Sequence, residues 1–270
     1  METMHRRPIP STGELLPVIG CGTWQAFDVR DAAPLVPVVE SLFAGCGSLI
    51  DSSPMYGKAE GVVGDVLGRM DALERAFVAT KVWTSGRDAG VAQMERSLAL
   101  LGRVDLMQVH NLLDWRTHFA TLRRWKEEGR VRYLGVTHYT PTAHDSLEAA
   151  MRAEPMDFVQ LDYALDDRAA ERRLLPLAAD RGIAVIVNRP FGGGGLARRV
   201  RGRKVPDFAA ELGCETWPQL LLKFILGHPA VTCAIPATAN PAHMADNARA
   251  GAGSLPDEAM RARIAAAFGS

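Results

Sequence analysis

The sequence has few cysteines, and nothing in their spacing suggests that they act together. Its four cysteines are Cys21, Cys46, Cys214 and Cys233; none belongs to a Cys-x-x-Cys pair or lies beside a histidine cluster. Neither a zinc site nor a disulfide framework is suggested by four cysteines spaced in this way. We therefore expect reduced thiols, no bound metal and a cytoplasmic protein.

Charge imbalance and long apolar runs are also missing. Lysine and arginine together number 31, as do aspartate and glutamate, so no overall positive field attracts nucleic acid or an acidic membrane. The sequence contains no run of about 18 apolar residues, which is the length that an ordinary membrane-spanning helix needs. Arg6 and Arg7 are followed by prolines and polar residues instead of the apolar run of an export signal. We expect a small-molecule partner, no nucleic-acid or membrane partner, and favour a monomer.

The sequence also lacks the glycine motif of dinucleotide-binding sheets. An open dinucleotide-binding sheet carries Gly-x-Gly-x-x-Gly between its first strand and helix. Here Gly20-Cys-Gly22 is followed by Thr-Trp-Gln, and Gly45-Cys-Gly47 precedes a strand. The doubly wound α/β sheet, which is the main rival architecture, is therefore disfavoured.

Eight short apolar segments are present, and they alternate with helical patterns. Expected strands cover 18–23, 48–50, 77–81, 104–110, 132–138, 158–163, 183–188 and 231–235. Expected helices cover 31–44, 60–70, 88–101, 118–128, 142–153 and 167–180. Several strands are apolar on both faces, as in a parallel sheet covered by helices. This pattern predicts an α/β protein with one domain, residues 1–270, folded as a (β/α)8 TIM barrel. A hairpin over residues 7–16 is expected to cap it.

Titratable residues stand where several of these strands end. Asp51 follows Leu49 and Ile50, with Tyr56 in the turn beyond it, while Lys81 and His110 each close a strand. Residues at the C-terminal ends of barrel strands meet at one rim and are typically catalytic. A neighbouring ammonium lowers the pKa of a phenol from about 10, so Tyr56 beside Lys81 is predicted to be a tuned general acid. Taken singly, each residue has an ordinary alternative, such as a turn carboxylate, a solvated lysine or a core histidine.

The order Asp51-x-x-x-x-Tyr56-Gly57, Lys81, His110 resembles the catalytic tetrad of the aldo-keto reductases. The likeness implies metal-free reduction of an aldehyde or ketone with hydride from a nicotinamide cofactor. Tyr56 would protonate the carbonyl oxygen, Lys81 would depress the pKa of Tyr56, Asp51 would hold Lys81, and His110 would orient the carbonyl. A short loop after His110 implies a shallow, open substrate pocket.

The resemblance extends over nearly the whole chain and implies a cofactor site. Gly129-Arg-Val-Arg-Tyr-Leu-Gly-Val-Thr137 and Val159-Gln160 are similar to family segments whose polar residues hold the nicotinamide amide. The implied cofactor-binding residues are Gly22, Thr23, Trp24, Thr137, His138, Gln160, Asn188, Pro190, Gly192, Gly193, Thr238, His243, Asp246 and Asn247.

Two positions depart from the family pattern around the nicotinamide. His138 stands where an asparagine is usual, and Asn188 replaces the tyrosine on which the nicotinamide stacks. Another group must therefore cover the ring. The glycines 192–195 after Phe191 could be a flexible connector or a phosphate-binding loop, and we favour the loop. The basic run 198–204 stays unassigned.

The tail segment 235–247 resembles the family's Ile-Pro-Lys-Ser...Arg-x-x-Glu-Asn, which binds the adenosine end of NADPH. Ala237 replaces the lysine and His243 the arginine that hold the 2′-phosphate, while Thr238 and Asn247 are kept. NADPH is the expected cofactor and NADH the alternative. Two other functions stay open, namely a regulatory subunit that binds cofactor but turns over slowly and an aldolase with Lys81 as a Schiff-base lysine.

Overall fold

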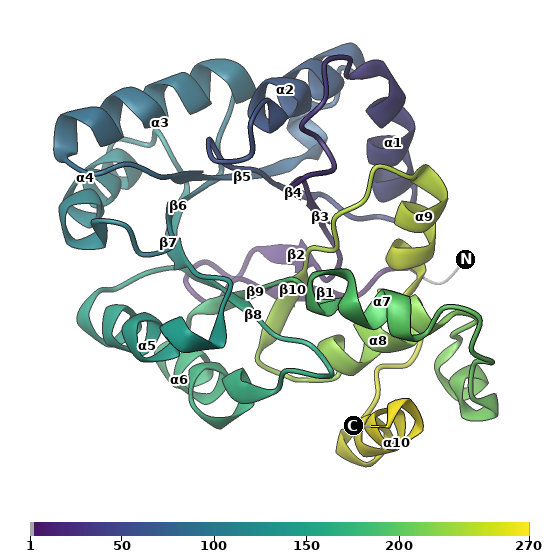
Figure 1. Cartoon of the computed structure of the whole chain (residues 1–270). Helices are drawn as coiled ribbons and strands as arrows, with labels where there is room; N and C mark the ends of the chain where they lie inside the picture. Colours follow the sequence, from purple (N-terminus) through teal and green to yellow (C-terminus); the bar gives the residue numbers. More distant parts are fainter. Residues whose placement is uncertain (1–2, 270) are drawn as a thin grey trace.

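Eight parallel strands form a nearly closed barrel surrounded by helices in this computed structural model, which describes residues 3–269 (Figure 1). The strands follow one another in chain order, from β3 to β10, around a single sheet. Isolated parallel bridges from Ile19 to Ala234 and from Gly22 to Ala237 join the first strand region to the last. The predicted (β/α)8 fold is confirmed.

Every predicted barrel strand is present. The strands are β3 (Cys21–Gly22), β4 (Leu49–Asp51), β5 (Phe77–Val82), β6 (Leu106–His110), β7 (Tyr133–Thr137), β8 (Phe158–Asp162), β9 (Ala184–Asn188) and β10 (Val231–Ala234). Only β3 is much shorter than expected. It pairs with β4 over two residues, because Ile19 bridges to β10 at the point where the barrel closes.

Helices cover the outside of the barrel. They are α1 (Val36–Ala44), α2 (Ala59–Arg69), α3 (Arg87–Leu101), α4 (Trp115–Glu127), α5 (His144–Ala153), α6 (Leu174–Arg181), α7 (Gly195–Arg199), α8 (Trp217–Leu226), α9 (Pro241–Arg249) and α10 (Glu258–Phe268).

Three predicted helix starts are wrong. The helix expected from residue 31 begins at Val36 after a 3-10 turn over Ala33–Leu35, where Pro34 interrupts the pattern. The one expected from 118 begins at Trp115, directly after Asp114 in the left-handed region. The one expected from 167 begins at Leu174, after a 3-10 turn over Ala169–Arg172.

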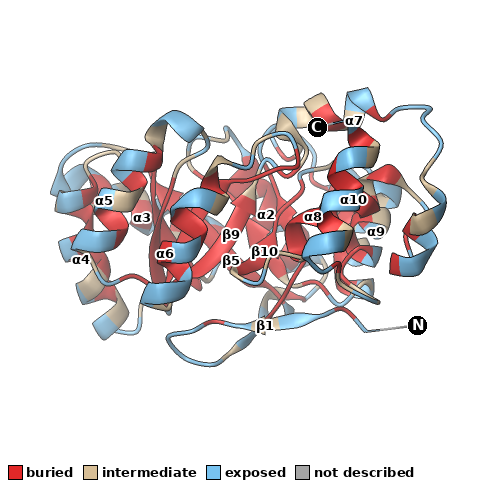
Figure 2. Cartoon of the chain, turned by 90° about the horizontal axis from the view of Figure 1, so that it is seen from below, coloured by how far each residue is buried: buried red, intermediate tan, exposed pale blue. Residues whose placement is uncertain are grey.

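An antiparallel hairpin of β1 (Arg6–Pro8) and β2 (Leu15–Pro17) closes one end of the barrel, as Figure 2 shows from below. Its Ile9 and Leu16 are fully buried among residues that begin the strands, including Phe77. The Arg7 guanidinium donates to backbone carbonyls after α8, at 2.9 Å from the oxygen of His228. The predicted cap is confirmed, and it leaves the C-terminal strand ends open for a site.

No helix within residues 3–269 is long and apolar enough to cross a membrane.

Candidate active site

The four residues of the predicted tetrad lie together at the C-terminal end of the barrel. Lys81, on β5, donates through Nζ to Asp51 Oδ2 and to the Ser52 carbonyl oxygen, both at 2.6 Å. The same nitrogen lies 4.9 Å from the centroid of the Tyr56 ring. The rings of Tyr56 and His110 meet edge to face, with centroids 5.6 Å apart. Lys81 and Asp51 are buried, so this ion pair forms the floor of the group.

Two glutamine side chains complete the environment of Asp51. Gln108 Nε2 and Gln160 Nε2 donate to Asp51 Oδ1 at 3.2 and 3.0 Å, so the buried carboxylate accepts from three donors when Lys81 is included. Gln108 is two residues before His110 on β6, so both side chains point to the same face of that strand. We did not identify Gln108 from the sequence, although this spacing was the signal that could have found it.

The pKa values of Tyr56 and Lys81 are both raised. Burial raises the pKa of Tyr56 by more than the nearby Lys81 ammonium lowers it. The expectation of a depressed phenol pKa is therefore wrong for the protein alone, although Lys81 acts in the expected direction. Burial lowers the pKa of Lys81, but Asp51 and Tyr56 outweigh it and leave the pKa raised. At neutral pH the phenol is protonated and the amine is charged.

His110 is held neutral. Burial and, secondarily, the Lys81 charge lower its pKa to about 2. Its Nδ1 lies 2.8 Å from Ser53 Oγ, and that oxygen accepts a hydrogen bond from the Met55 amide at 3.1 Å. When the Ser53 hydroxyl donates to Nδ1, the single ring proton lies on Nε2, where it can be donated to a ligand. Ser53 was not predicted, because no spacing rule links it to a histidine 57 residues away.

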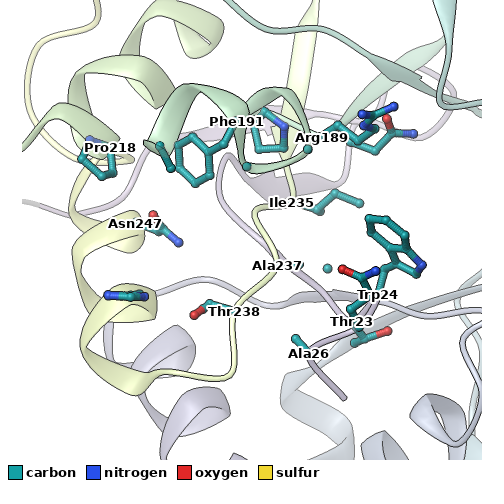
Figure 3. Close-up of a pocket in the computed structure, with 18 of the residues that line it drawn as sticks. Thr23, Trp24, Ala26, Arg189, Phe191, Pro218, Ile235, Ala237, Thr238 and Asn247 are labelled. Carbon is teal, nitrogen blue, oxygen red and sulfur yellow. The ribbon is translucent and has the colours of Figure 1, made fainter. Parts of the chain in front are cut away.

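A cavity of about 1110 Å³ opens beside these residues. Its lining includes Asp51, Tyr56 and His110 together with twelve of the predicted cofactor-binding residues. These twelve are Gly22, Thr23, Trp24, Thr137, Gln160, Asn188, Pro190, Gly193, Thr238, His243, Asp246 and Asn247. Ligand pockets usually measure about 300 to 1,000 Å³, so this one suits a large ligand. The shallow substrate pocket stays a prediction. Figure 3 shows Trp24 at one end and Asn247 at the other, with Ala237 between them.

Two predicted cofactor-binding residues do not line the cavity. His138 Nδ1 accepts hydrogen bonds from the amides of Tyr139 and Thr140 at 3.0 and 3.3 Å, and its ring stacks on that of Tyr139. Tyr139 lines the cavity in its place. Gly192 faces Asp166, since a Cβ on this glycine would lie 3.2 Å from Asp166 Oδ1.

Polar atoms suited to a nicotinamide amide lie at the ends of β7, β8 and β9. Asn188 Nδ2 donates to the His138 carbonyl at 3.0 Å, whereas the buried Asn188 Oδ1 has no partner among the described residues. Thr137 Oγ1 donates to Gln160 Oε1 at 2.9 Å, and Gln160 is also bonded to Asp51. The unpaired Asn188 oxygen can accept from a carboxamide NH₂ group, so the residues present fit this part of a dinucleotide.

The glycine-rich segment after β9 requires glycine. Gly193 and Gly194 have φ values of +62° and +89°, which other residues rarely adopt. A Cβ on Gly193 would lie 2.6 Å from Arg189 Nη2. Both glycines line the cavity, which lets a ligand approach the backbone closely. Phosphate binding there stays a prediction.

The other end of the cavity has little fixed positive charge where the family pattern would place it. Ala237 and His243 line this end, as the sequence implies, and so does the exposed carboxylate of Glu215. Asp246 accepts from Thr216 Oγ1 at 2.7 Å and from Arg249 Nη2 at 3.0 Å. Arg201 and Arg203, from the run that we left unassigned, also line the cavity. Arg203 is bonded to α10 carbonyl oxygens, which leaves Arg201 as the exposed guanidinium of this run at the cavity.

Comparisons with known proteins agree with this architecture. A model of the aldo/keto reductase family matches residues 18–266. The 9,11-endoperoxide prostaglandin H2 reductase of Trypanosoma cruzi is 26% identical over 91% of this chain and 86% of that protein. The NADH-specific methylglyoxal reductase of Escherichia coli is 26% identical over 76% of this chain and 73% of that protein. An aldo-keto reductase of Klebsiella pneumoniae, crystallised with NADPH, superposes with a TM-score of 0.79 at 25% identity, covering 99% and 95% of the two chains.

Proposed function

The chain belongs to the aldo/keto reductase family, and from this premise we propose that Tyr56 is the general acid in its NAD(P)H-dependent reduction of an aldehyde or ketone to an alcohol. The observation that carries the proposal is the position of the Tyr56 ring, which lies beside the buried Asp51–Lys81 pair and against His110 on the wall of a large cavity.

Tyr56 gives its proton to the carbonyl oxygen as negative charge develops there. Its raised pKa keeps the phenol protonated until that moment. The phenolate that remains lies beside the Lys81 ammonium, which stabilises the negative charge in a buried site where electrostatic interactions are strong. Asp51 holds Lys81 in place and balances its charge before the transfer. A bound reduced nicotinamide supplies the hydride.

His110 orients the carbonyl by donating from Nε2. A neutral imidazole suits this role, because it polarises the oxygen without competing with Tyr56 as a stronger acid. Ser53 fixes the ring by bonding to Nδ1.

The cofactor is proposed to extend along the cavity from the catalytic group toward α9. Thr137, Gln160 and Asn188 lie where they can hold the nicotinamide amide, and Gly193 lies where it can approach the diphosphate. Thr238 and Asn247 line the adenosine end. Both NADPH and NADH are proposed as cofactors, since one relative is crystallised with NADPH and another is described as NADH-specific.

The aldolase alternative conflicts with the state of Lys81. A Schiff-base lysine needs a neutral amine, whereas Asp51 keeps Lys81 charged at neutral pH. Borohydride reduction in the presence of a carbonyl substrate should therefore leave Lys81 unlabelled.

Fluorescence titration with NADPH and NADH, followed by a panel of aldehydes and ketones, tests the proposal. We expect binding of at least one cofactor and consumption of it with several carbonyl compounds. Binding without any turnover would favour the regulatory-subunit alternative, and absence of binding to both cofactors would contradict the proposed function.

A further inference from the structure

Arg189 extends a guanidinium across the catalytic mouth of the cavity. It follows Asn188, the last residue of β9, yet its Nη1 donates to the carbonyl oxygen of Tyr139, beyond the end of β7, at 3.2 Å. The guanidinium carbon lies 5.7 Å from the centroid of the Tyr139 ring. Since β8 lies between β9 and β7 in the sheet, the side chain passes over the end of β8. Figure 3 shows Arg189 at the same end of the cavity as Trp24.

An unusual backbone conformation and a neighbouring glycine allow the guanidinium to take this position. Arg189 has a φ of +49°, a conformation that costs energy for a residue other than glycine and is typical of functional sites. Gly193 leaves space for the guanidinium, since even a Cβ there would lie 2.6 Å from Nη2. Arg189 is nevertheless exposed and lines the cavity.

No ion pair neutralises Arg189 within the described residues, where its polar contact is with the Tyr139 carbonyl oxygen. The nearest catalytic charges, Asp51 and Lys81, neutralise each other. The carboxylate of Asp246, at the other end of the cavity, is paired with Arg249. A guanidinium that lines a cavity and forms no ion pair within the described residues is suited to bind a carboxylate or phosphate by two parallel hydrogen bonds.

The strand order places this charge near the catalytic residues. β7, whose following residues hold Arg189, pairs directly with β6 in a register that sets Thr137 opposite His110. Exposed apolar side chains surround the same mouth, with Trp24, Met55 and Tyr139 between 40 and 48% exposed. A ligand that reaches Tyr56 and His110 can therefore rest on these side chains and present a second group to Arg189.

We propose that Arg189 binds a carboxylate of the substrate, so that the enzyme prefers aldehydes or ketones that carry an acidic group on an apolar or aromatic body. This rests on the proposed carbonyl reduction. The same anion chemistry occurs in the cofactor diphosphate, because Gly193 touches both Arg189 and the cavity. The experiment separates these two sources.

The test compares para-carboxybenzaldehyde with the neutral para-nitrobenzaldehyde, which has nearly the same shape. In Arg189→Gln we expect kcat/KM for the carboxylate substrate to fall about 10- to 100-fold relative to the neutral one, the range for a lost hydrogen bond to a charged group. Cofactor Kd and turnover of the neutral aldehyde should stay unchanged. Arg189→Lys should recover part of the preference. Arg116→Gln is the matched control, since Arg116 is an exposed guanidinium 4.3 Å from the Trp115 ring centroid and does not line the cavity.

Several outcomes would overturn the proposal. If kcat/KM of Arg189→Gln falls equally for both aldehydes and its cofactor Kd rises, Arg189 binds the cofactor diphosphate instead. If the kinetics of Arg189→Gln are unchanged, Arg189 has no role in substrate binding. Turnover of neither aldehyde by the wild type would count against the proposed function. In that case, the affinity for para-hydroxymethylbenzoate, measured by tryptophan fluorescence, still tests whether Arg189 binds a carboxylate. Equal affinities of wild type and Arg189→Gln for this compound would contradict carboxylate recognition.

Discussion

At the scale of single residues, Tyr56 retains its proton although an ammonium group lies next to it. Burial removes water from both protonation states but penalises the phenolate more, and this effect exceeds the attraction of Lys81. Tyr56 is therefore protonated at neutral pH. It gives up its proton only during the reaction, when the carbonyl oxygen becomes basic.

A pH profile of the reduction tests this balance. The rate should fall only as the pH rises through the pKa of Tyr56, above the ordinary phenol value of about 10, because the protonated form is the active one. Lys81 lowers that pKa, so Lys81→Met should move the fall to still higher pH and should slow the reaction about 10²-fold at neutral pH.

Lys81→Met leaves Asp51 buried without its partner, so the double variant Asp51→Asn, Lys81→Met serves as the control. Lys81 affects the pKa of Tyr56 more than Asp51 does, and the double variant should therefore shift the profile in the same direction. If the rate of both variants falls at the same pH as that of the wild type, Lys81 does not tune the acidity of Tyr56.

The tetrad could be predicted from sequence because each member ends or follows an apolar strand, and barrel geometry brings strand ends together. The contacts of Ser53, Gln108 and Arg189 could not be predicted in this way, although the spacing from His110 indicated which face of β6 Gln108 occupies. Their partners lie 50 to 57 residues away and depend on which strands are neighbours and how each side chain turns. His138 does not line the cavity, since its Nδ1 accepts hydrogen bonds from local backbone amides, and its part in cofactor binding stays a prediction.

At the scale of elements, the N-terminal hairpin caps the barrel. Ile9 and Leu16 extend the barrel's interior packing by one layer at the end opposite the catalytic residues. The hairpin should therefore contribute to stability and not to catalysis.

Ile9→Ala separates these two contributions. Loss of a fully buried aliphatic side chain typically lowers the free energy of unfolding by about 2 to 5 kcal/mol. Urea unfolding should show that loss, while kcat at a temperature where the variant is folded should match the wild type. Leu15→Ala is the matched control, because Leu15 is 54% exposed and its loss should change stability by less than about 0.5 kcal/mol. A large fall in kcat for Ile9→Ala would show that the hairpin affects the active site.

Strands were easier to predict than helix starts. Most strands are rich in apolar residues, as burial on both faces requires, and polar strand residues such as Lys81 and Gln108 are hydrogen-bonded within the site. Helix starts depend on local backbone geometry, as at Asp114, where a residue in the left-handed region precedes α4. That residues 1–270 form a single domain stays a prediction.

At the scale of the whole molecule, the residues along the cavity bear on the choice of cofactor. The catalytic end holds Arg189, whereas the adenosine end holds Ala237 and His243 in place of two basic residues and adds Glu215. A 2′-phosphate carries close to two negative charges at neutral pH, and each charge-assisted hydrogen bond to it contributes about 1.5 to 3 kcal/mol. NADPH should therefore be only weakly preferred over NADH.

The ratio of the two cofactor dissociation constants at pH 8 checks this point. With Ala237 and His243 at the adenosine end, the preference for NADPH should be small. Ala237→Lys combined with His243→Arg should give a strong NADPH preference. A wild-type preference of about a thousandfold at pH 8 would instead assign the 2′-phosphate to another basic group, with Arg201 as the exposed candidate at the cavity.

Single-turnover reduction of an aldehyde by enzyme-bound cofactor, compared between wild type and Tyr56→Phe, tests the central claim most directly. The phenylalanine ring keeps the packing against His110 and lacks only the proton donor. We predict that cofactor Kd stays within about twofold while the rate of cofactor oxidation falls about 10²-fold or more, the range for loss of a general acid. Oxidation at the wild-type rate in Tyr56→Phe would contradict the account.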